Sequence, residues 1–243
     1  MQLYFLGTNG WFASKTGETS CTLIQTNKFN IILDIGSGIK NIKKININKK
    51  PIIIFLSHLH YDHIEGIHSL SNIFKKENVT IYIHKCYLKK LKFFFSSPFT
   101  KNFSKYKNKI KIKEFNSKPP SLNFIFKQLR HSNPCFGFRF IIEKKTLSYC
   151  TDTSDCKNID ILSKNSDLLI IESNNPAKFK KTKFHLNSSE AINIGIRNSV
   201  KKMALMHFDP VNFETISKRN NIKKLSNYSQ KVIITKDKMN ISL

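Results

Sequence analysis

The sequence predicts an α+β fold in which β-sheets are sandwiched between helices. Short apolar runs rich in β-branched residues alternate with turn signals along the whole chain, as is typical of many short strands. Helices are expected between several of these runs, which places the two kinds of element in packed layers. No internal repeat or low-complexity linker interrupts the chain, and 243 residues with 40% apolar side chains suit a single domain over residues 1–243.

The first half of the chain supplies the early strands, expected at residues 2–6, 20–26 and 30–33. A turn over 34–38 follows, because its glycines permit unusual backbone angles. Pro51 then precedes the fully apolar run 52–56, which predicts a buried central strand that leads into a histidine-rich loop.

The second half continues the same alternation. Its clearest helix begins at Asn187, because an Asn cap with Glu190 three residues later predicts a capping box, and Ile192, Ile196 and Val200 follow at helical spacing. Further strands are expected around residues 79–83, 110–115, 124–129, 136–143, 147–150, 168–171, 203–206 and 231–234.

The charge of the chain favours a polyanionic partner. The formal net charge is +25, from 41 Lys plus Arg against 16 Asp plus Glu. Clustered lysines displace counterions from phosphates and accelerate encounter with them. Lysine enrichment by drift in an AT-rich genome is the competing explanation, since only four of the basic residues are arginines, namely Arg130, Arg139, Arg197 and Arg219.

Targeting signals and cysteines indicate in which cellular compartment the protein is expected. The longest apolar run, 52–56, is far shorter than the ~20 residues of a transmembrane helix, and the start of the chain lacks the basic region of a signal peptide. The five cysteines form an odd set without a CxxC pair, as is typical of reduced thiols. We therefore expect a soluble cytoplasmic protein that does not enter a membrane.

The segment Ser57-His-Leu-His-Tyr-Asp-His63 brings four potential metal ligands together directly after the buried strand: His58, His60, Asp62 and His63. In an extended chain His58 and His60 point to the same side, and the following turn presents Asp62 and His63 from another direction. One segment can thus serve two metals. A surface loop with solvated histidines is the alternative.

Three further polar residues, His131, Asp152 and His207, each follow an apolar strand. Loops at one edge of a sheet can converge, and a buried imidazole or carboxylate there needs a partner such as a metal to offset desolvation. Each residue alone is equally well explained as structural. Together with the segment 57–63 they predict a metal centre.

In this order, the motifs resemble those of the metallo-β-lactamase superfamily of dinuclear metallohydrolases. The resemblance runs from Gln2 to about Asp209 and includes His58-x-His60-x-Asp62-His63 followed by Gly66. It implies a four-layer αβ/βα sandwich of two mixed β-sheets flanked by helices, with the site at one edge. It also implies two divalent metal ions, one held by His58, His60 and His131, the other by Asp62, His63 and His207, with Asp152 bridging both.

Zinc is the expected metal, because imidazoles and carboxylates without thiolate suit it, although manganese or iron would accept the same ligands. His60 favours hydrolysis over electron transfer, since the redox branch of the superfamily, the flavodiiron proteins, carries an acidic residue at this position. Cys135 and Cys150 lie near proposed ligands in the sequence, but a small buried thiol is the more common explanation for them.

Within the superfamily, segments 131–139, 149–153 and 205–208 resemble ribonuclease Z and its small relatives. Glu172 and His185 correspond in order and spacing to the acid and histidine that this family assigns to proton transfer, although the short motifs around them differ. Ribonuclease Z also carries a long arm that grips transfer RNA. This arm usually lies between the segments that match His131 and Asp152, where this chain has only residues 132–151, enough for a hairpin. Transfer RNA is therefore a less expected substrate.

The expected chemistry is attack on phosphorus by a hydroxide that bridges the two metals. Asp62 is a candidate catalytic residue as well as a ligand, and His185, oriented by Glu172, is the candidate proton donor to the leaving group. Both residues could instead be purely structural, with His185 at the start of a helix and Glu172 at the end of a strand.

Two lysine groups could contact a polyanion. Lys183 follows Lys178, Lys180 and Lys181 and precedes His185, which makes it the candidate substrate-binding residue. The alternating lysines of 105–113 would share one face of a strand, or simply protect an edge strand. The aromatic run 93–95 could stack bases, but such runs are more often core.

Three functions remain open at this point. The first is a metal-dependent phosphodiesterase, either a ribonuclease Z-like nuclease acting on RNA or a cyclic nucleotide hydrolase. The second is a hydrolase of esters, thioesters or lactones, which would not need Glu172, His185 or the lysines. The third is a metal-containing binding or regulatory protein without turnover. Relatives commonly form dimers, so a homodimer is a further expectation from the resemblance.

Overall fold

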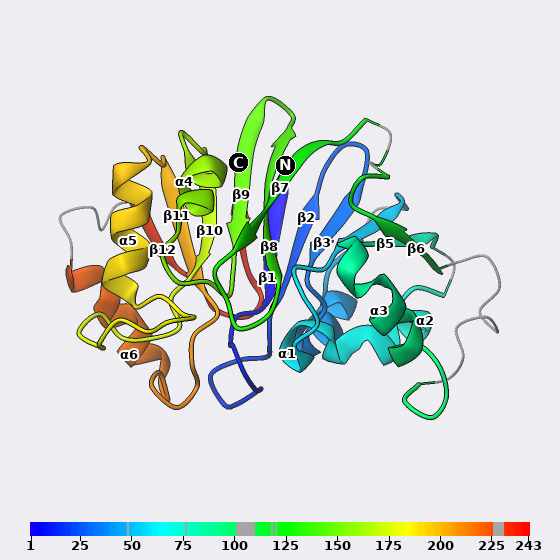
Figure 1. The fold of residues 1–243 in the computed structure, drawn as a ribbon, viewed down its shortest axis with the longest axis horizontal. Coiled ribbons are helices and arrows are strands. Elements are labelled where there is room, and N and C mark those ends of the chain that lie inside the picture. The colour runs from blue at the N-terminus through cyan, green and yellow to red at the C-terminus, as the bar shows by residue number, and fades with distance from the viewer. Residues whose placement is uncertain (48, 76, 101–109, 118, 120, 226–230) are drawn as a thin grey trace.

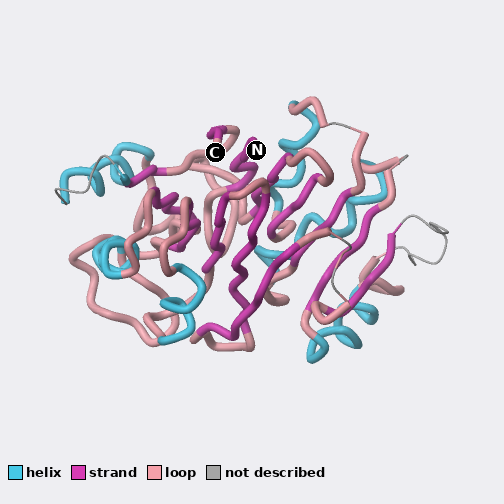
Figure 2. The backbone as a smooth tube through the Cα atoms, turned by 90° about the horizontal axis from the view of Figure 1, so that it is seen from above, coloured by secondary structure: helices cyan, strands magenta, loops and turns pink. Residues whose placement is uncertain are grey.

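The computed structural model describes residues 1–243 apart from 48, 76, 101–109, 118, 120 and 226–230. Two mixed β-sheets face each other, and helices cover the outer face of each, so the chain forms four layers (Figure 1). The sandwich predicted from the sequence is thus confirmed. The two chain ends lie side by side, as seen again from above in Figure 2.

The first sheet is seven-stranded, in the order β13-β1-β2-β3-β4-β5-β6. Neighbours from β13 to β3 are antiparallel, whereas those from β3 to β6 are parallel. Its strands are β1 (Gln2–Gly7), β2 (Cys21–Gln25), β3 (Asn30–Leu33), β4 (Ile52–Phe55), β5 (Val79–Ile83), β6 (Ile110–Glu114) and β13 (Met239–Ser242).

The second sheet is six-stranded, in the order β12-β11-β10-β9-β8-β7. Here β12 to β9 are parallel, and β7, β8 and β9 form antiparallel hairpins. Its strands are β7 (Asn123–Leu129), β8 (Cys135–Ile142), β9 (Lys145–Cys150), β10 (Leu168–Glu172), β11 (Lys202–Met206) and β12 (Val232–Ile234). The β8–β9 hairpin fills the interval 132–151, as expected for a chain without a long arm there.

The helices fall into two groups. Those on the side of the first sheet are α1 (Tyr61–Ile64), α2 (Leu70–Ile73) and α3 (Leu88–Phe94), with the 3₁₀ turns η1 (Ser37–Lys44), η2 (Glu65–Ser69) and η3 (Lys85–Tyr87). Those on the side of the second sheet are α4 (Lys157–Ser163), α5 (Ser188–Arg197) and α6 (Ile216–Asn220), with η5 (Asn221–Leu225).

Helix α5 begins at the predicted cap. The Asn187 side chain accepts a hydrogen bond from the Glu190 backbone N–H at 2.9 Å, and Glu190 Oε2 accepts one from the Asn187 N–H at 3.0 Å. This reciprocal capping box satisfies two N–H groups that otherwise have no partner within the helix.

The main core lies between the two sheets. Phe55 of β4 packs its ring against rings of the opposite sheet, with centroids 4.9 Å from Phe124, 5.4 Å from Phe138 and 5.1 Å from Phe140. A second apolar cluster fills the space between the second sheet and helices α4 and α5. Such packing makes the framework rigid, so the loops at its edges are held in fixed positions.

The strand predictions agree with the structure to within a few residues at their ends, but β13 was missed. Lys111 and Lys113 lie exposed on the edge strand β6, in line with the edge-strand alternative, while Lys105, Lys107 and Lys109 lie outside the described residues. In the aromatic run, Phe93 is exposed and Phe95 is buried. Among the described residues, no helix has both the length and the apolarity to cross a membrane.

Candidate metal centre

The predicted ligands converge at one edge of the sandwich. His58, His60, Asp62 and His63 follow β4, while His131, Asp152 and His207 follow β7, β9 and β11 of the facing sheet. Two groups of ligand atoms result, each with all its atoms within 4.8 Å of one another: His58, His60, His131 and Asp152, and Asp62, His63, Asp152 and His207. Asp152 belongs to both groups, which is the arrangement expected of a carboxylate shared by two ions.

Asp34, which sequence reasoning treated only as part of a turn, orients two of these histidines. Its Oδ2 lies 2.8 Å from Nδ1 of His63 and accepts hydrogen bonds from Ser57 Oγ at 2.9 Å and Tyr149 OH at 2.7 Å. Because the Ser57 hydroxyl donates to Asp34, it accepts from Nδ1 of His58, 2.9 Å away. Both rings therefore carry a proton on Nδ1 and direct Nε2 toward the centre. Burial lowers the pKa of His58, so its Nε2 is bare.

The bare nitrogen of His58 has no hydrogen-bond donor to pair with. His58 Nε2 is buried without a hydrogen-bond partner and lies 3.3 Å from Asp152 Oδ2, although both atoms are acceptors. Other imidazole nitrogens crowd the same space, with His63 Nε2 3.2 Å from His207 Nε2 and His60 Nδ1 3.1 Å from His131 Nε2. A lone pair that faces a carboxylate in a buried site is costly unless a cation lies between the two groups. The residues present thus fit bound metal ions.

The electrostatics of the pocket also favour cations. Burial lowers the pKa of His60 to about 4 and that of His131 to about 3, so both imidazoles are neutral and available as ligands near pH 7. Burial opposes the charged form of His207 too, but Asp152 outweighs it and raises the pKa of His207 to about 10. Despite their burial, the pKa values of Asp62 and Asp152 are well below the usual range because of neighbouring histidines.

Glu172 and His185, predicted as a proton-transfer pair, lie next to this centre. Glu172 is buried at the end of β10, and its Oε2 lies 3.1 Å from His185 Nδ1. Its Oε1 accepts a hydrogen bond from the backbone N–H of Thr153, the residue after Asp152. Burial lowers the pKa of His185, but the Glu172 carboxylate outweighs it, so the net shift is upward. One carboxylate thus holds both His185 and the Asp152 loop.

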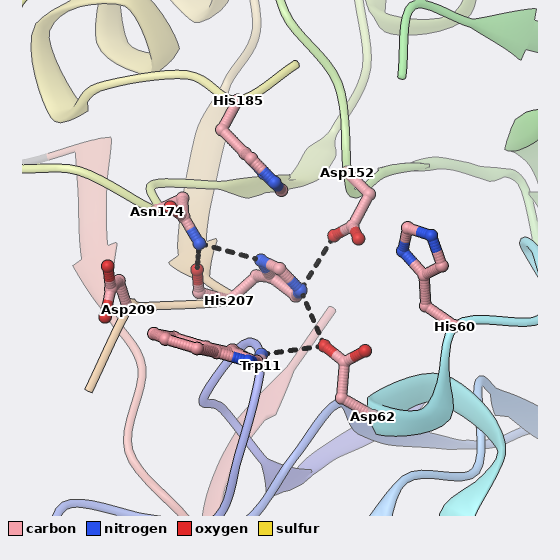
Figure 3. A pocket seen from close by; sticks show the side chains of 8 residues that line it. All are labelled: Trp11, His60, Asp62, Asp152, Asn174, His185, His207 and Asp209. Carbon is pink, nitrogen blue, oxygen red and sulfur yellow. Dashed lines mark hydrogen bonds and ion pairs between the residues drawn. The ribbon is translucent and has the colours of Figure 1, made fainter. Parts of the chain in front are cut away.

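A pocket of about 180 Å³ opens onto the ligands (Figure 3). Sequence reasoning missed three of its lining residues, Trp11, Asn174 and Asp209. Lys183 is exposed beside the ring of Phe184 and is not among the residues that line the pocket, so its contact with substrate stays a prediction. The lining residues are Trp11, His60, Asp62, Asp152, Asn174, His185, His207 and Asp209.

The fold and the histidine–aspartate site define a metallo-hydrolase with the metallo-β-lactamase fold. The family model of the β-lactamase superfamily domain matches residues 41–208, and the chain belongs to this superfamily. Its family and its buried clusters of imidazole and carboxylate groups point to divalent metals as cofactors.

Particular relatives narrow the comparison. Ribonuclease Z of Clostridium perfringens is 26% identical over 282 residues, covering 86% of this chain and 89% of the relative. The probable metallo-hydrolase YhfI of Bacillus subtilis is 26% identical over 218 residues, covering 85% and 86%. The crystal structure of YhfI matches 99% of this chain and 98% of its own, with a TM-score of 0.79 and 24% identity. Human tRNase Z, short form, has a TM-score of 0.73 at 20% identity, covering 100% and 99%. These structural likenesses show the fold.

Proposed function

We propose that the protein is a phosphodiesterase that works with two divalent metal ions, expected to be zinc, on RNA or a smaller nucleotide. The observation that carries this proposal is the pairing of His185 with the buried carboxylate of Glu172 directly beside two candidate ligand groups that share Asp152. An ester or thioester hydrolase needs the metal ligands but has no use for such a pair.

His58, His60 and His131 would hold one ion, and Asp62, His63 and His207 the other, with Asp152 shared between them. When bound, two such ions supply a nucleophilic water near neutral pH and neutralise charge on the attacked phosphate. Cys135 is not a ligand in this proposal, because its Sγ lies 3.7 Å from Nδ1 of His58, on the side of the ring away from the centre, and bonds to the Thr151 carbonyl at 3.2 Å.

The protein's own contribution to bond cleavage is a proton for the leaving oxygen. His185 lines the pocket, and its ring centroid lies 5.1 Å from that of His131 and 5.9 Å from that of His207. The bond to Glu172 engages Nδ1 and leaves Nε2 to face the pocket. An imidazolium held there can protonate an alkoxide as the phosphorus–oxygen bond breaks.

The short β8–β9 hairpin bears on the size of the substrate. The alignment with the Clostridium ribonuclease Z is longer than this chain, so that relative carries residues with no counterpart here. We infer that the substrate is a short or single-stranded RNA, or a nucleotide, rather than a folded transfer RNA. In this proposal exposed Lys183 attracts the polyanion from outside the pocket, so its effect would be on KM and would weaken with salt.

The proposal is tested by assaying zinc-loaded protein on bis(p-nitrophenyl) phosphate, p-nitrophenyl acetate and a thioester. We expect phosphodiester turnover that collapses in Asp62→Ala. On a dinucleotide, whose alkoxide leaving group needs a proton, kcat should also fall at least ~100-fold in His185→Ala. The matched control is His68→Ala, an exposed histidine outside the pocket, which should leave the rate unchanged. If the protein hydrolyses the thioester but no phosphodiester, and His185→Ala does not change that rate, the ester or thioester alternative is favoured instead.

A further inference from the structure

Trp11 is a large apolar side chain left open to solvent at the mouth of the metal pocket. It is the single tryptophan of the sequence, 67% exposed, and it lines the pocket. Its nearest aromatic neighbour is Phe12, in an edge contact with ring centroids 5.1 Å apart. Burying a tryptophan is normally favourable, so an exposed one beside a reactive centre needs an explanation.

The loop around Trp11 is firmly held, so the exposure of the indole does not come from a slack loop. The backbone N–H of Trp11 donates to Asp62 Oδ2 at 2.8 Å, and the Gly10 N–H donates to the Phe208 carbonyl at 3.0 Å. The Asn9 side chain donates to Ser14 Oγ at 3.1 Å and to the Gly17 carbonyl at 2.9 Å.

Two features of this loop carry a structural cost. Trp11 has a φ of 61°, in the left-handed region that bulky residues rarely adopt. A Cβ on Gly10 would lie only 2.4 Å from Cε1 of His207, so the backbone passes as close to this candidate ligand as a glycine allows. Strain of this kind persists where it serves a site, and here it presents the indole next to the metal ligands.

Two polar residues complete this side of the pocket. Figure 3 shows Trp11, Asn174 and Asp209 grouped on the side away from His60. The Asp209 carboxylate accepts from the Val211 N–H at 2.7 Å and from Asn212 Nδ2 at 2.8 Å, which leaves it further acceptor capacity. A carboxylate repels phosphate but accepts from hydroxyl and amino groups, so this side suits the neutral, hydrogen-bonding part of a substrate.

We propose that Trp11, Asn174 and Asp209 form a subsite for the nucleoside attached to the scissile phosphate. The base stacks on the indole, and hydroxyl or amino groups of the nucleoside donate to Asp209. This inference rests on the proposed function, because the metal side of the pocket must hold the phosphate. The pocket of about 180 Å³ is smaller than typical ligand sites of ~300–1,000 Å³, so the base would lie at its mouth, on the exposed face of the indole.

The experiment compares two phosphates that differ only in the base. Zinc-loaded protein is titrated with adenosine 5′-monophosphate and with ribose 5-phosphate, by calorimetry and by the fluorescence of the single tryptophan. We expect the nucleotide to quench the emission and to bind at least about fivefold more tightly, as stacking of one base implies. In calorimetry, Trp11→Ala should abolish this preference and Trp11→Phe should retain most of it.

The matched control is Lys15→Ala, an exposed residue of the same loop, which should keep the wild-type preference. Metal content and melting temperature of each variant show that it is folded. Equal affinities for the two phosphates, or a preference that survives in Trp11→Ala, would overturn the subsite while phosphodiester turnover persists. Absence of turnover on every phosphodiester would overturn the proposed function instead. The binding preference is measured by calorimetry, which does not depend on turnover.

Discussion

At the scale of single residues, the candidate centre depends on groups that never touch a substrate. Each ligand histidine has two ring nitrogens, and the partner of one nitrogen decides what the other can do. Asp34 engages Nδ1 of His63, and Ser57 engages Nδ1 of His58. The Phe184 carbonyl, 3.3 Å from Nδ1 of His131, orients that ring in the same way. The donors are thus oriented before any ion arrives.

Asp34→Asn should weaken metal binding by about 10–100-fold. Asparagine tolerates the positive φ of 55° at this position, so the backbone can be kept while the charge that orients His63 is lost. The measurement is competition for zinc with a chelating dye. Asp160→Asn, on helix α4 away from the centre, is the control. Equal affinity in the Asp34 variant and the wild type would show that the carboxylate does not act through His63.

Glu172→Gln should move the alkaline limb of the kcat–pH profile to lower pH. A general acid must carry its proton, so activity falls as the pH rises through the pKa of His185. Glu172 raises that pKa against the effect of burial, and the neutral amide removes the raising charge. The profile is measured on a dinucleotide, whose alkoxide leaving group needs a proton, with wild-type protein in the same buffers. An unchanged alkaline limb would contradict the role of His185 as proton donor.

At the scale of elements, helix α6 holds the loop that carries Trp11. Arg219 of α6 is fully buried and donates to Thr8 Oγ1 at 3.2 Å, to Thr16 Oγ1 at 2.8 Å and to the Asn9 side chain. Its guanidinium also lies over the ring of Phe208, 4.6 Å from the centroid. One side chain thus ties the loop before Trp11 to the residue that follows His207.

Arg219→Met should destabilise the fold by about 3 kcal/mol, because it leaves the hydroxyl and amide groups around it without their donor in a buried site. Urea unfolding measures this loss. The control is Lys218→Met on the same helix, whose exposed ion pair with Glu214 is screened by solvent and should contribute little to stability. A similar loss in both variants would mean that the buried guanidinium adds nothing specific.

At the scale of the whole molecule, the centre joins the two halves of the sandwich. The ligands of segment 58–63 extend from the first sheet, and His131, Asp152 and His207 extend from the second. Each candidate ion would therefore contact both halves. Metal bound at this junction stabilises the packing of the two sheets against each other as well as the loops themselves.

Each bound zinc ion, at 100 times its dissociation constant, should stabilise the protein by about 2.7 kcal/mol. For a chain of this length that corresponds to a rise in melting temperature of about 5–10 °C. Calorimetry with and without zinc measures the shift, and a chelator should reverse it. Asp152→Ala, which removes the shared carboxylate, should lose most of the rise. A rise of the same size in that variant would show that zinc binds elsewhere.

Most of the elements and all seven candidate ligands could be predicted from the sequence. Strand patterns depend on neighbours within a few residues, and the dense motif 57–63 is local as well. The convergence of His131, Asp152 and His207 could be predicted because each follows a strand at the same edge, a rule that depends only on the order of elements.

The remaining features depend on contacts that form when the chain folds. β13 was missed because its short, mixed segment Met239–Ser242 is stabilised by pairing with β1 at the other end of the chain. Asp34 acquires its role from His63 and Tyr149, which are distant in the sequence, and Trp11 faces the pocket only because Asp62 and Arg219 hold its loop. These roles arise from contacts between residues far apart in the chain, whose free energies no local pattern of side chains contains.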